Sequence, residues 1–122
     1  MKIRTLFVAN SVVQFLFGIG FIFAPGFLLG LFGTQTDATG TTLAHVAGGV
    51  ILSLGVIGWL GKDVQPGPIQ DAMVWGFTFA HFQAGVLTVL AILGGTFNAV
   101  AWPVVAMDAF FTVALPWARS RK

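Results

Sequence analysis

The chain alternates four long apolar segments with short segments that are rich in polar residues, glycine or proline. The first apolar segment covers residues 5–23 and the second residues 43–60. The third runs from Gln70 or Asp71 to the glycine pair at 94–95, and the fourth covers residues 99–117. Each is close to the roughly 20 residues that cross a bilayer core as a helix, at about 1.5 Å of rise per residue. We therefore predict an all-α integral membrane protein, a four-helix bundle whose spans run up, down, up and down.

Proline and glycine mark the end of the first span. Pro25 and Gly26 interrupt it, because proline lacks a backbone donor and glycine is flexible. The apolar segment 27–32 is too short to cross a bilayer. We expect it to lie at the outer surface as a short helix, or to extend the first span beyond a kink. Residues 33–42, rich in threonine and glycine, are expected to form a loop.

Composition supports a membrane protein with a single domain over residues 1–122. Of the 122 residues 57% are hydrophobic and only 8% are charged, whereas roughly a quarter of the residues of a soluble domain are charged. The net charge of +2 argues against nucleic acid as a partner. The absence of cysteine excludes disulfides, thiol catalysis and thiolate metal sites.

Basic residues occur only before the first span, between the second and third spans, and after the fourth. The connections around Asp37 and Asn98 contain none. Segments rich in lysine and arginine stay on the cytoplasmic side of a membrane. We therefore predict a multi-pass inner-membrane protein with both termini in the cytoplasm. The six basic residues are Lys2, Arg4, Lys62, Arg119, Arg121 and Lys122.

Small residues in the second and third spans predict that these two helices pack closely. Lipid provides no hydrophobic drive for helices to associate, so close contact depends on small residues and polar pairs. The second span contains Gly48, Gly55 and Gly58, and the third contains Ala84 and Gly85.

Six polar or ionisable residues within the apolar segments are the candidates for chemistry. Such groups are unfavourable in a bilayer and usually face the interior of a bundle. Counted from the inner ends, Gln14 and Asp108 lie at a depth of about 13 Å and His81 at about 15 Å. We therefore predict a buried polar cluster of Asp108, His81 and Gln14, in which His81 is the best placed hydrogen-bond donor to Asp108 and Gln14 is the second candidate. The six residues are Asn10, Gln14, His45, His81, Gln83 and Asp108.

The other three candidates are assigned secondary roles. Asn10 shares one face of the first span with Gln14, and His45 lies nearer the outer surface. Gln83 lies on the opposite face of its helix from His81. We expect it to point to a neighbouring subunit, because an amide facing lipid would have no partner.

Three interpretations of the Asp108–His81 pair remain open. A structural pair would hold two helices in register. A proton- or cation-responsive site is the second, because an intramembrane aspartate beside a histidine can exchange protons. The third is a haem or chlorin ligand at His45 or His81, although their different depths argue against a bis-histidine site. No cofactor or metal site is predicted beyond this third interpretation.

Catalytic motifs are absent from the sequence. There is no GxSxG, HExxH, P-loop or glycine-rich dinucleotide fingerprint, and only one carboxylate lies at membrane depth. We therefore predict no catalytic residues and no hydrolytic or redox turnover by the isolated chain.

The whole chain resembles small bacterial four-helix inner-membrane proteins of unknown function. The resemblance rests on Pro25 and Gly26, on the run LLGLFG at residues 28–33, and on the segment from Gly48 to Trp59. It implies a bacterial inner-membrane location but no particular activity. The length is also similar to that of small multidrug transporters and fluoride channels. The multidrug family depends on an acidic residue in its first span, where this chain has Gln14. Members of both families often insert in both orientations, which the one-sided charge pattern of this chain opposes. Neither activity is therefore transferred.

The sequence thus favours a small membrane protein that acts through helix–helix contacts, as a homo-oligomer or as an accessory subunit of a membrane complex. Its partners would be the lipid bilayer and other membrane subunits or copies of itself. The alternative is a small proton-coupled transporter or channel with its site at Asp108 and His81. A haem- or pigment-binding membrane subunit is the third hypothesis.

Overall fold

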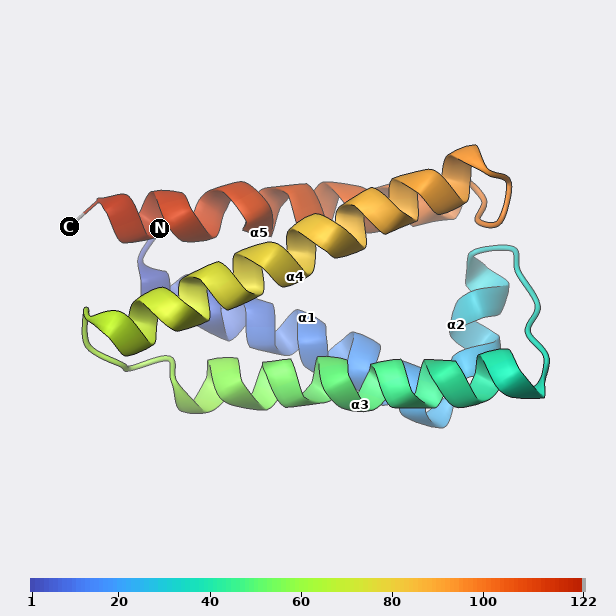
Figure 1. The fold of residues 1–122 in the computed structure, drawn as a ribbon, viewed down its shortest axis with the longest axis horizontal. Helices are drawn as coiled ribbons and strands as arrows, with labels where there is room; N and C mark the ends of the chain where they lie inside the picture. Colours follow the sequence, from blue (N-terminus) through green and yellow to red (C-terminus); the bar gives the residue numbers. More distant parts are fainter. Residues whose placement is uncertain (122) are drawn as a thin grey trace.

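The computed structural model describes residues 1–121, and Lys122 lies outside them. The described chain contains four long helices and one short helix, joined by short connections (Figure 1). The elements are α1 (Ile3–Phe23), α2 (Pro25–Leu31), α3 (Ala38–Leu60), α4 (Pro68–Leu93), and a 3-10 turn, η1 (Ala99–Ala101), that continues into α5 (Trp102–Ser120). No strand occurs among these residues. All four predicted apolar segments form helices long and apolar enough to cross a membrane.

The structure corrects one helix boundary and selects one of the two expectations for the segment after the first span. Residues 33–42 do not form a loop throughout, because α3 begins at Ala38. The Asp37 side chain accepts a hydrogen bond from the backbone N–H of Gly40 at 2.8 Å, and this N-cap allows the polar residues 38–42 to be helical. Of the two expectations for the segment after the first span, the separate short helix is the one present, since the backbone at Ala24 is not helical (φ −142°, ψ 53°).

The long helices pack in two pairs, α1 with α3 and α4 with α5 (Figure 1). The prediction that the second and third spans pack through their small residues is therefore wrong. The glycines of α3 face α1 instead: a Cβ at Gly48 would lie 2.9 Å from the Gly18 carbonyl oxygen, and one at Gly58 2.5 Å from Ser11 Oγ. On α4, a Cβ at Gly85 would lie 3.2 Å from Asp108 Cβ, so this glycine faces α5.

The two pairs meet in an apolar core near the end of the molecule where both termini lie (Figure 1). The Phe7 ring packs edge-on against Phe77, with centroids 5.7 Å apart. Burial of these side chains excludes water from the core itself. The core of the described chain consists of Leu6 and Phe7 from α1, Val74 and Phe77 from α4, and Phe111 and Leu115 from α5.

Ion pairs join the helix ends beside this core. Arg4 Nε donates to Asp63 Oδ1 at 2.6 Å, and Arg119 pairs with Asp71. The Arg4 hydrogen bond lowers the pKa of the Asp63 carboxyl below its ordinary value, and the charges of Arg4 and Lys62 act in the same direction. Asp63 is therefore ionised at neutral pH.

The opposite end of the molecule is closed by contacts between the α2–α3 and α4–α5 connections. The backbone N–H of Asn98 donates to the Phe32 carbonyl at 2.8 Å, and the Phe32 and Phe97 rings lie 5.3 Å apart. Gly33 adopts a positive φ of 78°, and a Cβ there would lie 2.7 Å from Asn98 Nδ2. The two helix pairs therefore touch at both ends, and space remains between them in the middle.

Candidate functional site

His81 lies at the centre of a buried polar cluster that joins three helices. Its side chain is 3% exposed. Ring atom Nδ1 lies 2.7 Å from Asp108 Oδ1, and Nε2 lies 2.7 Å from Asn10 Oδ1. The contact expected between His81 and Asp108 is present, and it links α4 to α5. The second bond links α4 to α1, so one imidazole ring connects the two helix pairs.

Asn10, rather than Gln14, completes the cluster from α1. Gln14 Nε2 donates to Asn10 Oδ1 at 3.4 Å, and no hydrogen bond joins Gln14 to Asp108 in the described structure. The second candidate donor, Gln14, therefore contacts Asn10 rather than Asp108. Depth counted along the chain assumes parallel helices, whereas α1 and α4 run obliquely to their neighbours (Figure 1). Asn10 and Gln14 share one helix face, and this shared face is the feature of the sequence that indicated Asn10 as well as Gln14.

Two proton arrangements of the His81–Asp108 pair fit the hydrogen-bond geometry, because the donor and acceptor roles of the ring nitrogens depend on the tautomer. With the Asn10 carbonyl oxygen toward the ring, Nε2 of His81 donates to it, and one further proton is shared between Nδ1 and Asp108, so the pair has no net charge. With the Asn10 and Gln14 amides both rotated, the Asn10 NH₂ group donates to Nε2, and Nδ1–H donates to an ionised Asp108.

Packing holds the pair in this orientation. The Phe111 ring stacks on the His81 imidazole, with centroids 4.6 Å apart and an interplanar angle of 18°. Thr112 Oγ1 donates to the Asp108 backbone carbonyl at 2.7 Å. Gly85 allows α5 to approach α4 beside Asp108. These contacts depend on the α4–α5 pairing, which follows from the short turn between the two helices.

Three buried polar atoms of this region have no hydrogen-bond partner within the described part of the chain. They are Asn10 Nδ2, Ser11 Oγ and Asp108 Oδ2. The second carboxyl oxygen of Asp108 is the most significant, because buried carboxyl oxygens normally accept hydrogen bonds. Asp108 therefore has capacity for a further donor or cation.

A chamber of about 490 Å³ extends from the cluster into the space between the two helix pairs. Gln14, His81 and Asp108 form its polar end. Its other walls are mainly apolar, and no lysine or arginine of residues 1–121 lines it. Four aromatic rings contribute to these walls, those of Phe17, Phe21, Phe32 and Phe97. An apolar chamber with a few polar groups at one end is the usual form of a small-molecule site.

The two remaining candidates lie outside the cluster. His45 is exposed on α3 and is not part of the chamber wall. Gln83 is exposed on α4 and lines the chamber together with His81, because α4 forms one of its walls. No hydrogen bond of the Gln83 side chain is found within residues 1–121.

The cluster is poorly suited to hold a metal or a haem. Both ring nitrogens of His81 are engaged in hydrogen bonds, so a metal ion could bind only if one of them broke. No group of three His, Cys, Asp or Glu side chains in the described chain is placed to hold a metal ion.

Comparisons of the chain with protein-family models, with curated proteins and with solved structures found no match.

Proposed function

We propose that this chain is a small proton-coupled transporter, which binds a hydrophobic organic cation in the chamber and exchanges it for the proton of the Asp108–His81 pair. The observation that carries the proposal is that Asp108, whose buried Oδ2 has no hydrogen-bond partner within residues 1–121, lines an aromatic-walled chamber together with His81. This is the alternative that the sequence left open, and the chamber now favours it.

The chamber walls favour a hydrophobic cation over other ligands. An anion would meet the Asp108 carboxyl group without a lysine or arginine among the described lining residues to offset it. A wholly apolar ligand would leave Asp108 Oδ2 unpartnered. A cation with an apolar body satisfies the carboxyl group, and its charge is attracted to the faces of aromatic rings such as Phe17 and Phe21.

Charge balance couples cation binding to release of a proton. In the arrangement with one shared proton the Asp108–His81 pair has no net charge, so a bound cation would add one uncompensated positive charge in an apolar environment. An isolated charge there is unfavourable by several kcal/mol. Release of the shared proton restores neutrality. The polar groups around the pair are Asn10 and Gln14 from α1 and Thr112 from α5. The residues of α3 that face α1 are glycines, which do not titrate. No other titratable group of the described chain contacts the pair.

The closed core determines from which side the exchange occurs. Phe77, Phe111 and Leu115 separate the cluster from the end where the termini lie, whereas the chamber lies on the other side. Exchange in this conformation therefore takes place through the chamber. Transport requires a second conformation in which the two helix pairs part at the core.

A proton-release measurement tests this function. When tetraphenylphosphonium is added to purified protein in weakly buffered detergent solution, we expect release of about one proton per bound cation, since the proposed exchange replaces the proton that Asp108 and His81 share with the cation. Asp108→Asn should bind the cation more weakly and release no proton, whereas His45→Ala should behave like the unchanged protein. Saturable binding without proton release, or the same release from Asp108→Asn, would contradict the proposal.

We also propose that the chain lies in the bacterial inner membrane with both termini in the cytoplasm. Lys2, Arg4, Lys62, Arg119 and Arg121 support this orientation, because they lie at one end of the molecule and such residues stay cytoplasmic. Cysteines introduced at Thr36 and Thr96 should react with an impermeant thiol reagent added to intact cells. Labelling of these positions only after lysis would reverse the orientation.

Assembly with other membrane subunits, or with further copies of the chain, is a second candidate function. Gln83 favours it, because its exposed amide would have no hydrogen-bond partner in lipid. A helix of a neighbouring subunit could satisfy this amide. The mass of the same purified preparation in mild detergent separates the two functions. A monomer that still binds the cation would favour transport, with the Gln83 amide available to contact the ligand in the chamber.

A further inference from the structure

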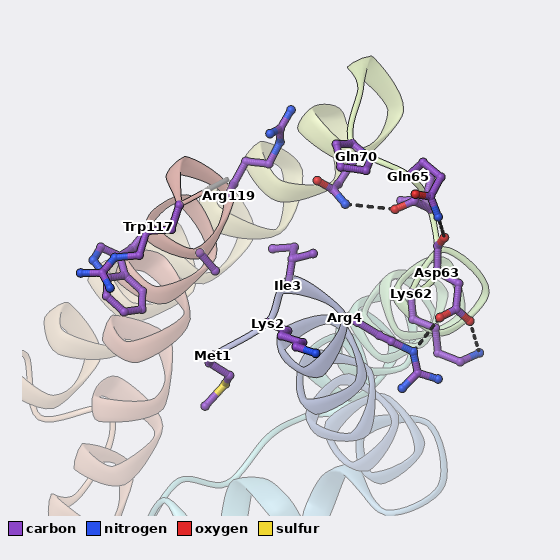
Figure 2. Close-up of a pocket in the computed structure, with 14 residues that line it drawn as sticks. Met1, Lys2, Ile3, Arg4, Lys62, Asp63, Gln65, Gln70, Trp117 and Arg119 are labelled. Atoms are coloured by element: carbon purple, nitrogen blue, oxygen red, sulfur yellow. Dashed lines mark hydrogen bonds and ion pairs between the residues drawn. The ribbon is translucent and has the colours of Figure 1, made fainter.

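A second hollow lies at the end of the molecule where the termini meet, and it shares no residue with the chamber. Its volume is about 620 Å³. The start of α1, the α3–α4 loop and the end of α5 surround it (Figure 2). Gln70 Nε2 donates to the Val64 carbonyl at 3.0 Å and so holds the loop in place as one wall. We call this the basic hollow.

The basic hollow has a strong excess of positive charge. Asp63 is the only carboxylate among its described lining residues. Asp71 does not line the hollow, but it pairs with Arg119, which does. These two acids offset only part of the positive charge. The basic residues that line the hollow are Lys2, Arg4, Lys62, Arg119 and Arg121.

Several donors in the basic hollow remain available for an anion. Arg4 and Arg119 each contact their carboxylate through Nε, so the terminal nitrogens of both guanidinium groups can still donate. Arg121 lies over the Trp117 ring at 4.0 Å, and Lys2 is exposed. Neither Lys2 nor Arg121 pairs with a carboxylate within residues 1–121. Guanidinium forks match the oxygens of a phosphate group.

The floor and the size of the hollow indicate more than a free ion. Ile3, Val64 and Ala118 contribute apolar surface beneath the charged side chains. At about 30 Å³ per water, the volume corresponds to about 20 waters, which is far more than a phosphate ion needs. A phosphate group attached to a glycerol and acyl chains would use both the charged rim and the apolar floor.

We propose that the basic hollow binds the phosphate headgroup of an anionic phospholipid of the same leaflet. Lys2 and Arg4 belong to α1, whereas Arg119 and Arg121 belong to α5. These side chains lie around the rim of the hollow rather than at one point (Figure 2). A lipid headgroup seated across the rim would contact both helices and so join the α1–α3 pair to the α4–α5 pair, next to the core where the two pairs already meet. The lipid thereby stabilises the packing of one pair against the other.

Lipid titration of the full-length protein tests this site. Delipidated protein in neutral detergent is mixed with phosphatidylglycerol, phosphatidylcholine or inorganic phosphate, and bound lipid is measured by native mass spectrometry together with the melting temperature. We expect phosphatidylglycerol alone to bind and to raise the melting temperature. Equal stabilisation by inorganic phosphate would overturn the lipid assignment in favour of an ion site, and equal binding of phosphatidylcholine would overturn the site itself.

A charge-matched pair of variants locates the binding. Lys2→Gln with Arg121→Gln should lower the affinity for phosphatidylglycerol about 25-fold, since each basic residue near anionic lipid contributes about a factor of five. Gln35→Glu with Thr96→Glu changes the net charge equally at the opposite end, and should leave the affinity unchanged. Equal losses in both double variants would show non-specific attraction and overturn the proposal. Helix content by circular dichroism verifies that each variant is folded.

Discussion

Replacement of His81 by alanine is expected to lower the free energy of unfolding by about 2–4 kcal/mol. The ring makes two hydrogen bonds, to Asp108 and to Asn10, and stacks on Phe111. Hydrogen bonds between membrane helices contribute about 0.6–1.7 kcal/mol each, and the cavity left by the ring adds the loss of packing contacts. The loss is large because one side chain joins three helices, and because the Asp108 carboxyl group would remain buried without its His81 partner.

The second histidine of the chain provides the matched control. His45 is exposed on α3, so His45→Ala should change the free energy of unfolding by less than about 0.5 kcal/mol. Titration with sodium dodecyl sulfate in mixed micelles, followed by circular dichroism, measures both variants. Equal stability of His81→Ala and His45→Ala would show that the hydrogen bonds of His81 contribute nothing to the fold.

Replacement of Gly18 by alanine is expected to force α1 and α3 apart. A Cβ at this position would lie 2.7 Å from the backbone nitrogen and 2.9 Å from the Cα of Leu52. Backbone atoms cannot move aside as the end of a flexible side chain can. Overpacking of this kind destabilises by about 1–3 kcal/mol, which exceeds the roughly 0.5–1 kcal/mol that alanine gains over glycine within a helix.

Gly49 on α3 is the control for this substitution, because a Cβ there would meet nothing within 4 Å. Gly49→Ala should therefore leave stability unchanged or raise it slightly, through helix propensity alone. The same detergent titration measures both variants. If Gly18→Ala were as stable as Gly49→Ala, the close approach of α1 and α3 would not be needed for the fold.

Local properties of the sequence determined the helices. Hydropathy and length predicted four helices of membrane-spanning size, and Pro25 predicted the break after the first. These features act over a few neighbouring residues, so they can be found without tertiary structure. The start of α3 at Ala38 escaped prediction, because the cap at Asp37 made polar residues helical where hydropathy alone indicated a loop.

The contact between His81 and Asp108 was also accessible from the sequence. Only a short turn separates α4 from α5, so the two helices are antiparallel neighbours, and equal depth then brings these two side chains together. The depth count worked for this pair because both helices belong to the same hairpin.

Contacts between helices that are distant along the chain were decided by the tertiary structure alone. Glycines on α3 predicted a close helix contact but not its partner, which proved to be α1 through Gly18 rather than α4. The oblique path of α1 placed Asn10, not Gln14, against His81. The chamber and the basic hollow arise only where the two pairs meet at their ends and separate between them. Crossing angles and pairings of this kind depend on the fit of whole helix surfaces, which composition, periodicity and depth along one chain do not specify.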